Sequence, residues 1–359
     1  MNDSGVPPTP SQIGSEACFN LVGVAASASE RMADHSLVLA ATRIGRFLLW
    51  HRHRATNPHR GAIPQFPSLL FTMTTSFTRW IAPLFVAIAA VANLTAAAPK
   101  PLRVLLITGG CCHDYVTQKD ILKKGLEERA NVVVDHMHTP DKTTKPPLPS
   151  HLDPAYAQGY DVVIHDECAA DIKEADMVRN VLKPHRDGIP AVNLHCAMHS
   201  YRYAADFAQP LKPGSVGALW FDFLGLQSTR HGPQEPIAIR FVPGASPITK
   251  SLENWTTIKE ELYNNIQDPR AFPHHRSLAT GRQTVKSKDG TTSEVESVIV
   301  WTNEYGDKKT RVFSTTLGHN NVTVSDSRYL DLVTRGLLWA AGKLESNGKP
   351  ASGYGPQRH

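Results

Sequence analysis

From residue 102 onward, short apolar runs alternate with stretches of helical periodicity. Residues 102–108 (LRVLLIT) form an almost continuous apolar run, typical of a strand buried on both faces of a parallel sheet. A stretch with one apolar face follows from about 116 to 129. Further strands are predicted at 131–137, 161–165 and 189–195, and a second helix over 170–183, ending before Pro184. This alternation predicts βαβ units and a parallel sheet.

The alternation weakens after residue 197. Segments 220–225, 237–241 and 293–301 have the composition of strands or irregular insertions. Residues 256–263 resemble the start of a helix. A strand at 312–316 is predicted to pair with 298–301 through a turn at 304–308, and a helix over 326–343 closes the chain. We therefore expect an α/β domain with a mostly parallel sheet and insertions in its C-terminal half.

The first 98 residues lack this pattern. After Met73 come one arginine, the short apolar run 81–91 and small residues at 94–98. This is the layout of a secretory signal peptide, and the run is shorter than the roughly 20 residues of a membrane-spanning helix. We predict a signal peptide at 73–98, with an uncleaved anchor as the alternative. The protein is then exported, periplasmic or extracellular, with no stable membrane insertion after cleavage.

Residues 1–72 lie in front of that predicted signal. The simplest interpretation is a misassigned or disordered N-terminal extension, and an arginine-rich organellar presequence is the alternative. The folded domain is expected to cover residues 99–345. Residues 346–359 are expected to be a disordered tail.

The charge distribution excludes one large class of function. The chain holds 38 basic and 33 acidic residues, and seven of the arginines lie before residue 99, so the domain itself is close to neutral. No basic stripe is visible, which argues against nucleic-acid binding. The chain has 5 cysteines and no CxxC pair, so neither a disulfide-rich scaffold nor a zinc ribbon is expected. Cys111 and Cys112 are adjacent, an arrangement that rarely forms a disulfide.

Polar residues gather where the predicted strands end. Histidine, cysteine or carboxylate side chains occur in 109–114, 165–168, 195–199 and 318–321. Since ligands of open α/β sheets bind beyond the carboxyl ends of the strands, we predict a site on that edge. Gly109 and Gly110 do not match a dinucleotide-binding motif. They form either a plain turn or a turn that exposes backbone N–H groups to an oxyanion or a sugar hydroxyl.

Histidines are the main candidates for chemistry at this edge. His195 and His199 are four residues apart and share a face if a helix begins there, as two metal ligands can, although HExxH is absent. Buried, hydrogen-bonded histidines are the alternative. His113 and His319 are candidates for metal ligands or for acid–base groups. For His113, the alternative of an ordinary histidine in a surface loop is equally open.

Three further features are ambiguous. Cys196 occupies the place of a nucleophile elbow, but the flanking glycines are missing, which favours an inert buried thiol. Glu260 or Glu261 could reach inward, and His231 lies in a polar Pro/Gly loop. Trp220, Trp255 and Trp301 could stack on a sugar or pack in the core.

Taken in order, these stretches resemble the ThuA-like (trehalose-utilisation) family. The resemblance extends over about 102–343 and is carried by Leu194–Ala197, Phe223–Gly225 with His231, Ser246–Thr249, Glu260–Tyr263, Trp301 with Tyr305–Gly306, Arg311–His319 and Gly336–Ala341. It implies a flavodoxin-like, doubly wound sheet related to class I glutamine amidotransferases, and a sugar-related role. Family members keep an Asp beside the first-strand histidine, matched by His113-Asp114, and often have Ser in place of Cys196.

The chain departs from the glutaminase pattern, because the elbow glycines are absent and Asn320 and Asn321 follow His319. Glutaminase activity is therefore not expected. The leading hypothesis is an exported enzyme acting on a sugar or keto-sugar, with no nucleic-acid partner. Its predicted catalytic residues are His113, His195, Glu261 and His319. Its predicted substrate-binding residues are Gly109, Gly110, Asp114, Tyr263, His231 and Trp301. The candidate ligands for a divalent metal are His195, His199 and His319. The rivals are a Cys196-dependent hydrolase and a non-catalytic carbohydrate-binding module.

Overall fold

The computed structural model of the chain describes residues 99–202 and 204–357. The predicted extension at 1–72 and signal peptide at 73–98 lie outside the described residues. Within the described part, no helix is both long enough and apolar enough to cross a membrane.

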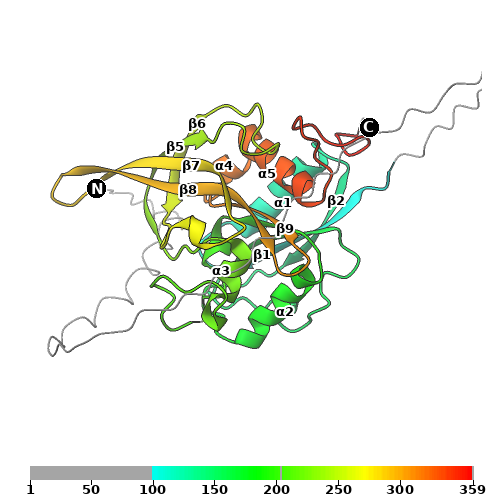
Figure 1. Ribbon diagram of the computed structural model, residues 1–359, viewed down its shortest axis with the longest axis horizontal. Helices are drawn as coiled ribbons and strands as arrows, with labels where there is room; N and C mark the ends of the chain where they lie inside the picture. Colours follow the sequence, from blue (N-terminus) through cyan, green and yellow to red (C-terminus); the bar gives the residue numbers. More distant parts are fainter. Residues whose placement is uncertain (1–98, 203, 358–359) are drawn as a thin grey trace, which may run out of the picture. The chain divides into compact units, whose positions relative to one another are not determined.

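The described elements begin with the expected alternation and continue into an antiparallel insertion (Figure 1). In chain order they are β1 (Leu102–Gly110), α1 (Tyr115–Glu127), β2 (Val132–His138), η2 (Pro149–His151), β3 (Val162–Cys168), α2 (Ala175–Arg186), β4 (Ala191–Leu194), η3 (His195–His199), η4 (Val216–Ala218), α3 (Leu219–Leu224), β5 (His231–Phe241), β6 (Trp255–Tyr263), η5 (Pro269–Ala271), β7 (Arg276–Lys286), β8 (Thr292–Tyr305), β9 (Thr310–Thr315), α4 (Asn321–Val324) and α5 (Ser327–Ala340).

The nine strands of the described residues join one sheet in the order β2-β1-β3-β4-β9-β8-β7-β5-β6. The first five in this order run parallel, and their arrangement fits the flavodoxin-like strand order. The remaining four are joined by antiparallel pairs, including the predicted hairpin of β8 and β9. The sheet is therefore evenly mixed rather than mostly parallel, because the insertion between β4 and β9 builds a complete antiparallel half.

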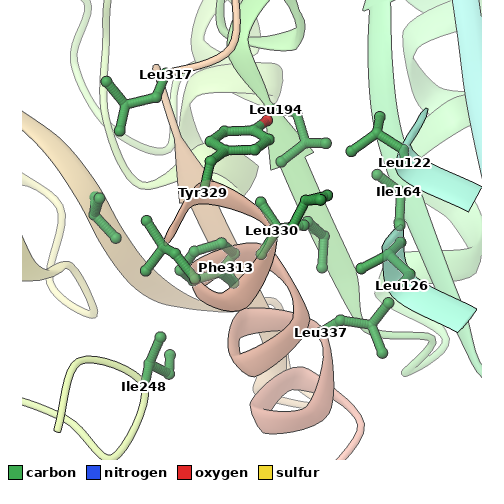
Figure 2. Close-up of a cluster of buried hydrophobic side chains, with 14 of the residues drawn as sticks. Leu122, Leu126, Ile164, Leu194, Ile248, Phe313, Leu317, Tyr329, Leu330 and Leu337 are labelled. Atoms are coloured by element: carbon green, nitrogen blue, oxygen red, sulfur yellow. The ribbon is translucent and has the colours of Figure 1, made fainter. Parts of the chain in front are cut away.

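Helices cover both faces of the parallel half. Helices α1, α4 and α5 contact one another, and α2 contacts α3 (Figure 1). The consecutive β4 residues Ala191 and Val192 point to different core clusters, as the alternation of side chains along a strand requires. Val192 packs with α1 and α5, whereas Ala191 packs with α2 and α3. Figure 2 shows the first cluster, in which Phe313 of β9 packs against α5.

Three predicted elements differ in the structure. Helix α2 continues through Pro184, because a proline near the end removes only one helical hydrogen bond and the Asp187 N–H still reaches the Lys183 oxygen. Residues 219–224 form helix α3, since a run of six mostly apolar residues is too short for its periodicity to separate helix from strand. Residues 255–263 form strand β6, where the β-branched Thr256, Thr257 and Ile258 outweigh the charged residues that suggested a helix.

The C-terminal segment also differs from the expected disordered tail. Residues 346–357 fold back on the sheet: the Asn131 N–H donates to the Tyr354 oxygen, and the Asn131 side-chain amide donates to Gly353 O at 2.9 Å. The Ala351 N–H donates to Lys343 O at 2.8 Å. The Asn131 bonds attach the segment to the start of β2, and the Ala351 bond attaches it to the chain that follows α5.

Close packing between α5 and β9 generates a prediction. A Cβ atom added at Gly336 would lie 2.3 Å from the Phe313 ring. Gly336→Ala should therefore lower the free energy of unfolding by about 1–3 kcal/mol, although alanine is the better helix former. Urea unfolding measures this, with Gly355→Ala as control because its nearest atom is 4.0 Å away. Equal stability of Gly336→Ala and the wild type would contradict the packing.

Candidate metal centre

Four segments far apart in the chain bring three imidazoles and a carboxylate together. His113 follows β1, His195 follows β4, His319 follows β9, and Glu261 comes from β6. One ligand atom from each of the four lies within 4.8 Å of the others. We call these residues the donor group. Three members follow parallel strands that end at the same sheet edge, where sequence reasoning placed the site.

The antiparallel insertion supplies the carboxylate and also fixes the last histidine. Glu260, next to Glu261 on β6, is fully buried. Its two carboxylate oxygens accept hydrogen bonds from the backbone N–H groups of His319 at 3.0 Å and Asn320 at 3.1 Å. The strand that delivers Glu261 therefore also fixes the loop that carries His319.

The orientation of His195 is set by the backbone. Its Nδ1 lies 2.6 Å from the carbonyl oxygen of Thr316, an acceptor only, so Nδ1–H donates and Nε2 faces the donor group. Nε2 is 3.4 Å from a Glu261 oxygen and 3.3 Å from the Tyr263 hydroxyl. His195 has a positive φ of 36°, which is rare for a residue with a side chain and marks local strain.

His113 and His319 complete the group. His113 Nε2 lies 3.1 Å from His319 Nδ1, and that Nδ1 lies 3.2 Å from a Glu261 oxygen. The second nitrogen of His113 is 3.2 Å from the Tyr115 hydroxyl at the start of α1. The second nitrogen of His319 is 2.9 Å from the Gln234 side-chain amide of β5. Each imidazole thus has a polar partner outside the group that fixes its orientation. For His195 this partner is a carbonyl oxygen that accepts the second ring N–H, as in metal-ligating histidines.

The electrostatics of the group are those of a buried anion among imidazoles. Burial acts to raise the pKa of Glu261, but hydrogen bonds from His195 and His319 outweigh it and hold that pKa far below its usual range. Burial acts to lower the pKa of His195, but the hydrogen bond and charge of Glu261 outweigh it and raise that pKa. Burial, followed by the charges of His195 and His319, lowers the pKa of His113. Glu261 is therefore ionised.

The donor group opens to solvent on one side. The side chains of His195 and Glu261 are 1% and 8% exposed, whereas those of His319 and His231 are 18% and 20% exposed. His231 Nε2 lies 3.5 Å from Glu261 at the exposed side. A small molecule would therefore approach past His231 and His319.

Several predicted site residues have other roles. His199 is outside the donor group, because the turn after β4 is a 3₁₀ helix, in which residues four apart do not share a face. Its Nε2 is 3.0 Å from Ser228 Oγ, and its ring stacks on Tyr263 with centroids 3.9 Å apart. Asp114 caps α1 by accepting from the Thr117 N–H, and it also accepts from Asn321.

Gly110 and Trp301 are likewise structural. The Gly110 N–H donates to Asp141 O, so it is not exposed to an oxyanion. Cβ atoms at Gly109 and Gly110 would lie 2.5 Å from Thr139 and 2.2 Å from the Cys168 carbonyl, so both glycines serve close strand packing. Trp301 is fully buried, and its indole N–H donates to Leu224 O. It belongs to the core and does not contact the donor group.

Other outcomes concern residues that sequence reasoning overlooked or doubted. Tyr115 and Thr316 orient His113 and His195, and no motif singles them out; their position just after strand ends was the only signal.

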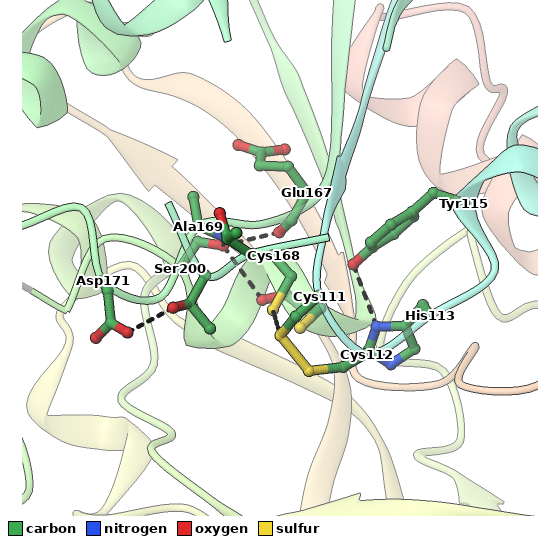
Figure 3. The surroundings of a disulfide bond; sticks show 12 residues. Cys111, Cys112, His113, Tyr115, Glu167, Cys168, Ala169, Asp171 and Ser200 are labelled. Atoms are coloured by element: carbon green, nitrogen blue, oxygen red, sulfur yellow. Dashed lines mark hydrogen bonds between the residues drawn. A yellow bond between two sulfur atoms is a disulfide. The ribbon is translucent and has the colours of Figure 1, made fainter. Parts of the chain in front are cut away.

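The structure contains a Cys111–Cys112 disulfide, contrary to expectation (Figure 3). Cys196 is buried, and its hydrogen bond with Cys168 together with burial raises the pKa of its thiol. A neutral thiol of this kind is a poor nucleophile.

Fold and site together define a mixed α/β domain with a histidine–carboxylate group at the carboxyl edge of its parallel strands. The family model described as ThuA, trehalose utilisation, matches residues 103–340. The chain belongs to the ThuA family. No curated protein matches it.

Comparison with solved structures bears on the fold. A ThuA-like protein from Parabacteroides merdae is 20% identical, with a TM-score of 0.52 over 72% of this chain and 98% of its own. A ThuA-like protein from Bacteroides uniformis is 17% identical, with a TM-score of 0.45 over 68% of this chain and 93% of its own. The glutaminase domain of Trypanosoma brucei CTPS with bound acivicin is 10% identical, with a TM-score of 0.36 over 70% of this chain and 99% of its own. The first of these supports the fold.

The role of Glu260 can be tested by stability. Glu260→Ala would leave the partly buried N–H groups of His319 and Asn320 without their acceptors, so the free energy of unfolding should fall by about 1–3 kcal/mol. Glu260→Gln, which keeps one acceptor oxygen, should lose less. Denaturant unfolding measures both, with the exposed Glu253→Ala as control. If Glu260→Ala unfolded like this control, Glu260 would not hold the His319 loop.

Proposed function

We propose that the protein is a metal-dependent enzyme that acts on a sugar or keto-sugar, with the donor group holding one divalent ion. The observation that carries the proposal is the convergence of His113, His195, Glu261 and His319 to within 4.8 Å. Four separate chain segments contribute to the group. Without a bound ion, burying a carboxylate together with several imidazoles costs free energy.

The chemistry of the donors fits a borderline metal ion. Three imidazoles and one carboxylate suit Zn²⁺, Fe²⁺ or Mn²⁺, whereas Ca²⁺ and Mg²⁺ prefer oxygen ligands alone. The bond from His195 Nδ1 to Thr316 O leaves Nε2 directed toward the group, as ligation requires. When bound, such an ion polarises a carbonyl or activates a water molecule.

Residues beside the group suit a hydroxylated substrate. The Tyr263 hydroxyl lies 3.3 Å from His195, and the partly exposed His231 lies 3.5 Å from Glu261. His231 can hydrogen-bond to a hydroxyl group of a sugar that enters from the exposed side, whereas the buried Tyr263 lies beside His195 at the inner end of the site. The family description, trehalose utilisation, supports a glucoside or its keto derivative as substrate. Export, as predicted for 73–98, places the enzyme where such sugars are taken up.

Metal content tests the proposal. The purified chain should contain about one divalent ion by inductively coupled plasma mass spectrometry. His195→Ala, Glu261→Gln and His319→Ala should each weaken binding by more than about tenfold, because even the loss of an outer-shell partner costs about 10–100-fold. His274→Ala, which removes an exposed histidine, is the matched control and should retain the ion.

Two results would contradict the metal proposal. One is a chain that stays metal-free after incubation with Zn²⁺, Fe²⁺ and Mn²⁺; the other is full metal retention in the Glu261 and His195 variants. A metal-loaded protein that turns over no glucoside or 3-keto-glucoside would favour a carbohydrate-binding module, which calorimetry with the same sugars would detect.

The rival mechanism through Cys196 makes a different prediction. Since the Cys196 thiol is buried and not among the four donors, Cys196→Ser should retain the metal ion and any turnover found with the sugar panel. His195→Ala, assayed in parallel, should lose both. Loss of turnover in Cys196→Ser alone, with metal content unchanged, would instead support a cysteine hydrolase.

A further inference from the structure

A second cluster of reactive side chains lies beside the donor group but does not overlap it. Cys111 and Cys112 form a disulfide (Figure 3). The thiols of Cys168 and Cys196 are free and buried. Cys168 and Cys196 pack together with Tyr115, and Cys111 packs against them. The proposed metal chemistry uses none of these four sulfur atoms.

The sheet itself brings Cys111 and Cys168 together. Strands β1 and β3 are parallel neighbours, and their register pairs Gly110 with Cys168, the last residue of β3. Cys111 comes next in the chain, and its sulfur lies 3.4 Å from the sulfur of Cys168, whose thiol is the donor of this contact. Neighbouring strands lie about 4.8 Å apart, which is inside the range of Cα separations, about 4.4–6.8 Å, that disulfides span.

We infer that the disulfide has two positions and that this cluster is an intramolecular thiol–disulfide exchange site. Cys168, as its thiolate, attacks the sulfur of Cys111. A Cys111–Cys168 bond forms, the Cys111–Cys112 bond breaks, and the electron pair leaves on the sulfur of Cys112. The proton given up by Cys168 is taken up by Cys112 through solvent. The step is redox-neutral and needs no external oxidant or reductant.

The surroundings favour this direction of exchange. Cys112 is exposed, so water can stabilise its sulfur as the leaving group, and the sulfur of Cys168 already lies 3.4 Å from the Cys111 sulfur that it attacks. Cys112 has a positive φ of 83°, a conformation that residues with side chains rarely adopt and that its release can relax. His113 follows Cys112 directly, so the exchange acts on the segment that carries it. The inference stands whether or not the donor group holds a metal ion.

Alkylation under native conditions tests the exchange. The full chain, prepared without reductant, is incubated with N-ethylmaleimide, quenched in acid, digested without reduction and mapped by mass spectrometry. We expect Cys112 to become alkylated over time, in molecules that carry a Cys111–Cys168 disulfide. In Cys168→Ser, Cys112 should stay unlabelled, since its disulfide partner cannot change. Absence of Cys112 labelling in the wild type, or equal labelling in Cys168→Ser, would overturn the inference.

A second variant keeps the test independent of how well Cys168→Ser folds. Cys112→Ser removes the leaving sulfur and leaves Cys111 opposite Cys168. Incubated with glutathione disulfide, this variant should form the Cys111–Cys168 bond, detected as a linked peptide that reduction separates. If both residues stayed as thiols or mixed disulfides with glutathione, the two sulfurs would not be positioned for exchange and the inference would fail.

Discussion

The ion pairing of Glu261 with its surrounding imidazoles is the interaction on which the site depends. A carboxylate that is 8% exposed must be compensated by partners, since an unpaired buried charge is prohibitively costly. His195, His231 and His319 lie within 3.5 Å of it. These partners come from both halves of the sheet, so the antiparallel insertion must dock on the parallel half for the charge to be tolerated. Folding of the insertion and assembly of the donor group are thus coupled.

This coupling explains which parts of the fold could be predicted from sequence. Strands β1, β3 and β4 are buried on both faces, and such strands show continuous apolar runs that are legible without a structure. The carboxyl ends of β1 and β4 could therefore be located, and with them His113 and His195, while His319 was located after the strand predicted at 312–316. Helix α3 and strand β6 were assigned wrongly because their identity is set by tertiary packing. Phe223 of α3 is fully buried, and Glu260 of β6 is ordered by N–H groups from a distant loop.

The individual roles of site residues were harder to predict than their location. His199 and Trp301 have the residue types that metals and sugars favour, yet both are held by hydrogen bonds to nearby structural groups. Which histidine reaches the group depends on the exact turn after each strand, and the 3₁₀ turn after β4 directs His195 inward and His199 elsewhere. Sequence spacing alone cannot distinguish a 3₁₀ turn from an α-helical one.

The central claim is that His113, His195, Glu261 and His319 hold one metal ion. An anomalous-difference map from crystals grown with Zn²⁺ tests it most directly. The account predicts a strong peak among the four side chains, about 2.0–2.2 Å from their nitrogen and oxygen donors. A metal-free donor group with well-ordered side chains, or a peak bound only by Cys111, Cys112 and Cys168, would contradict it.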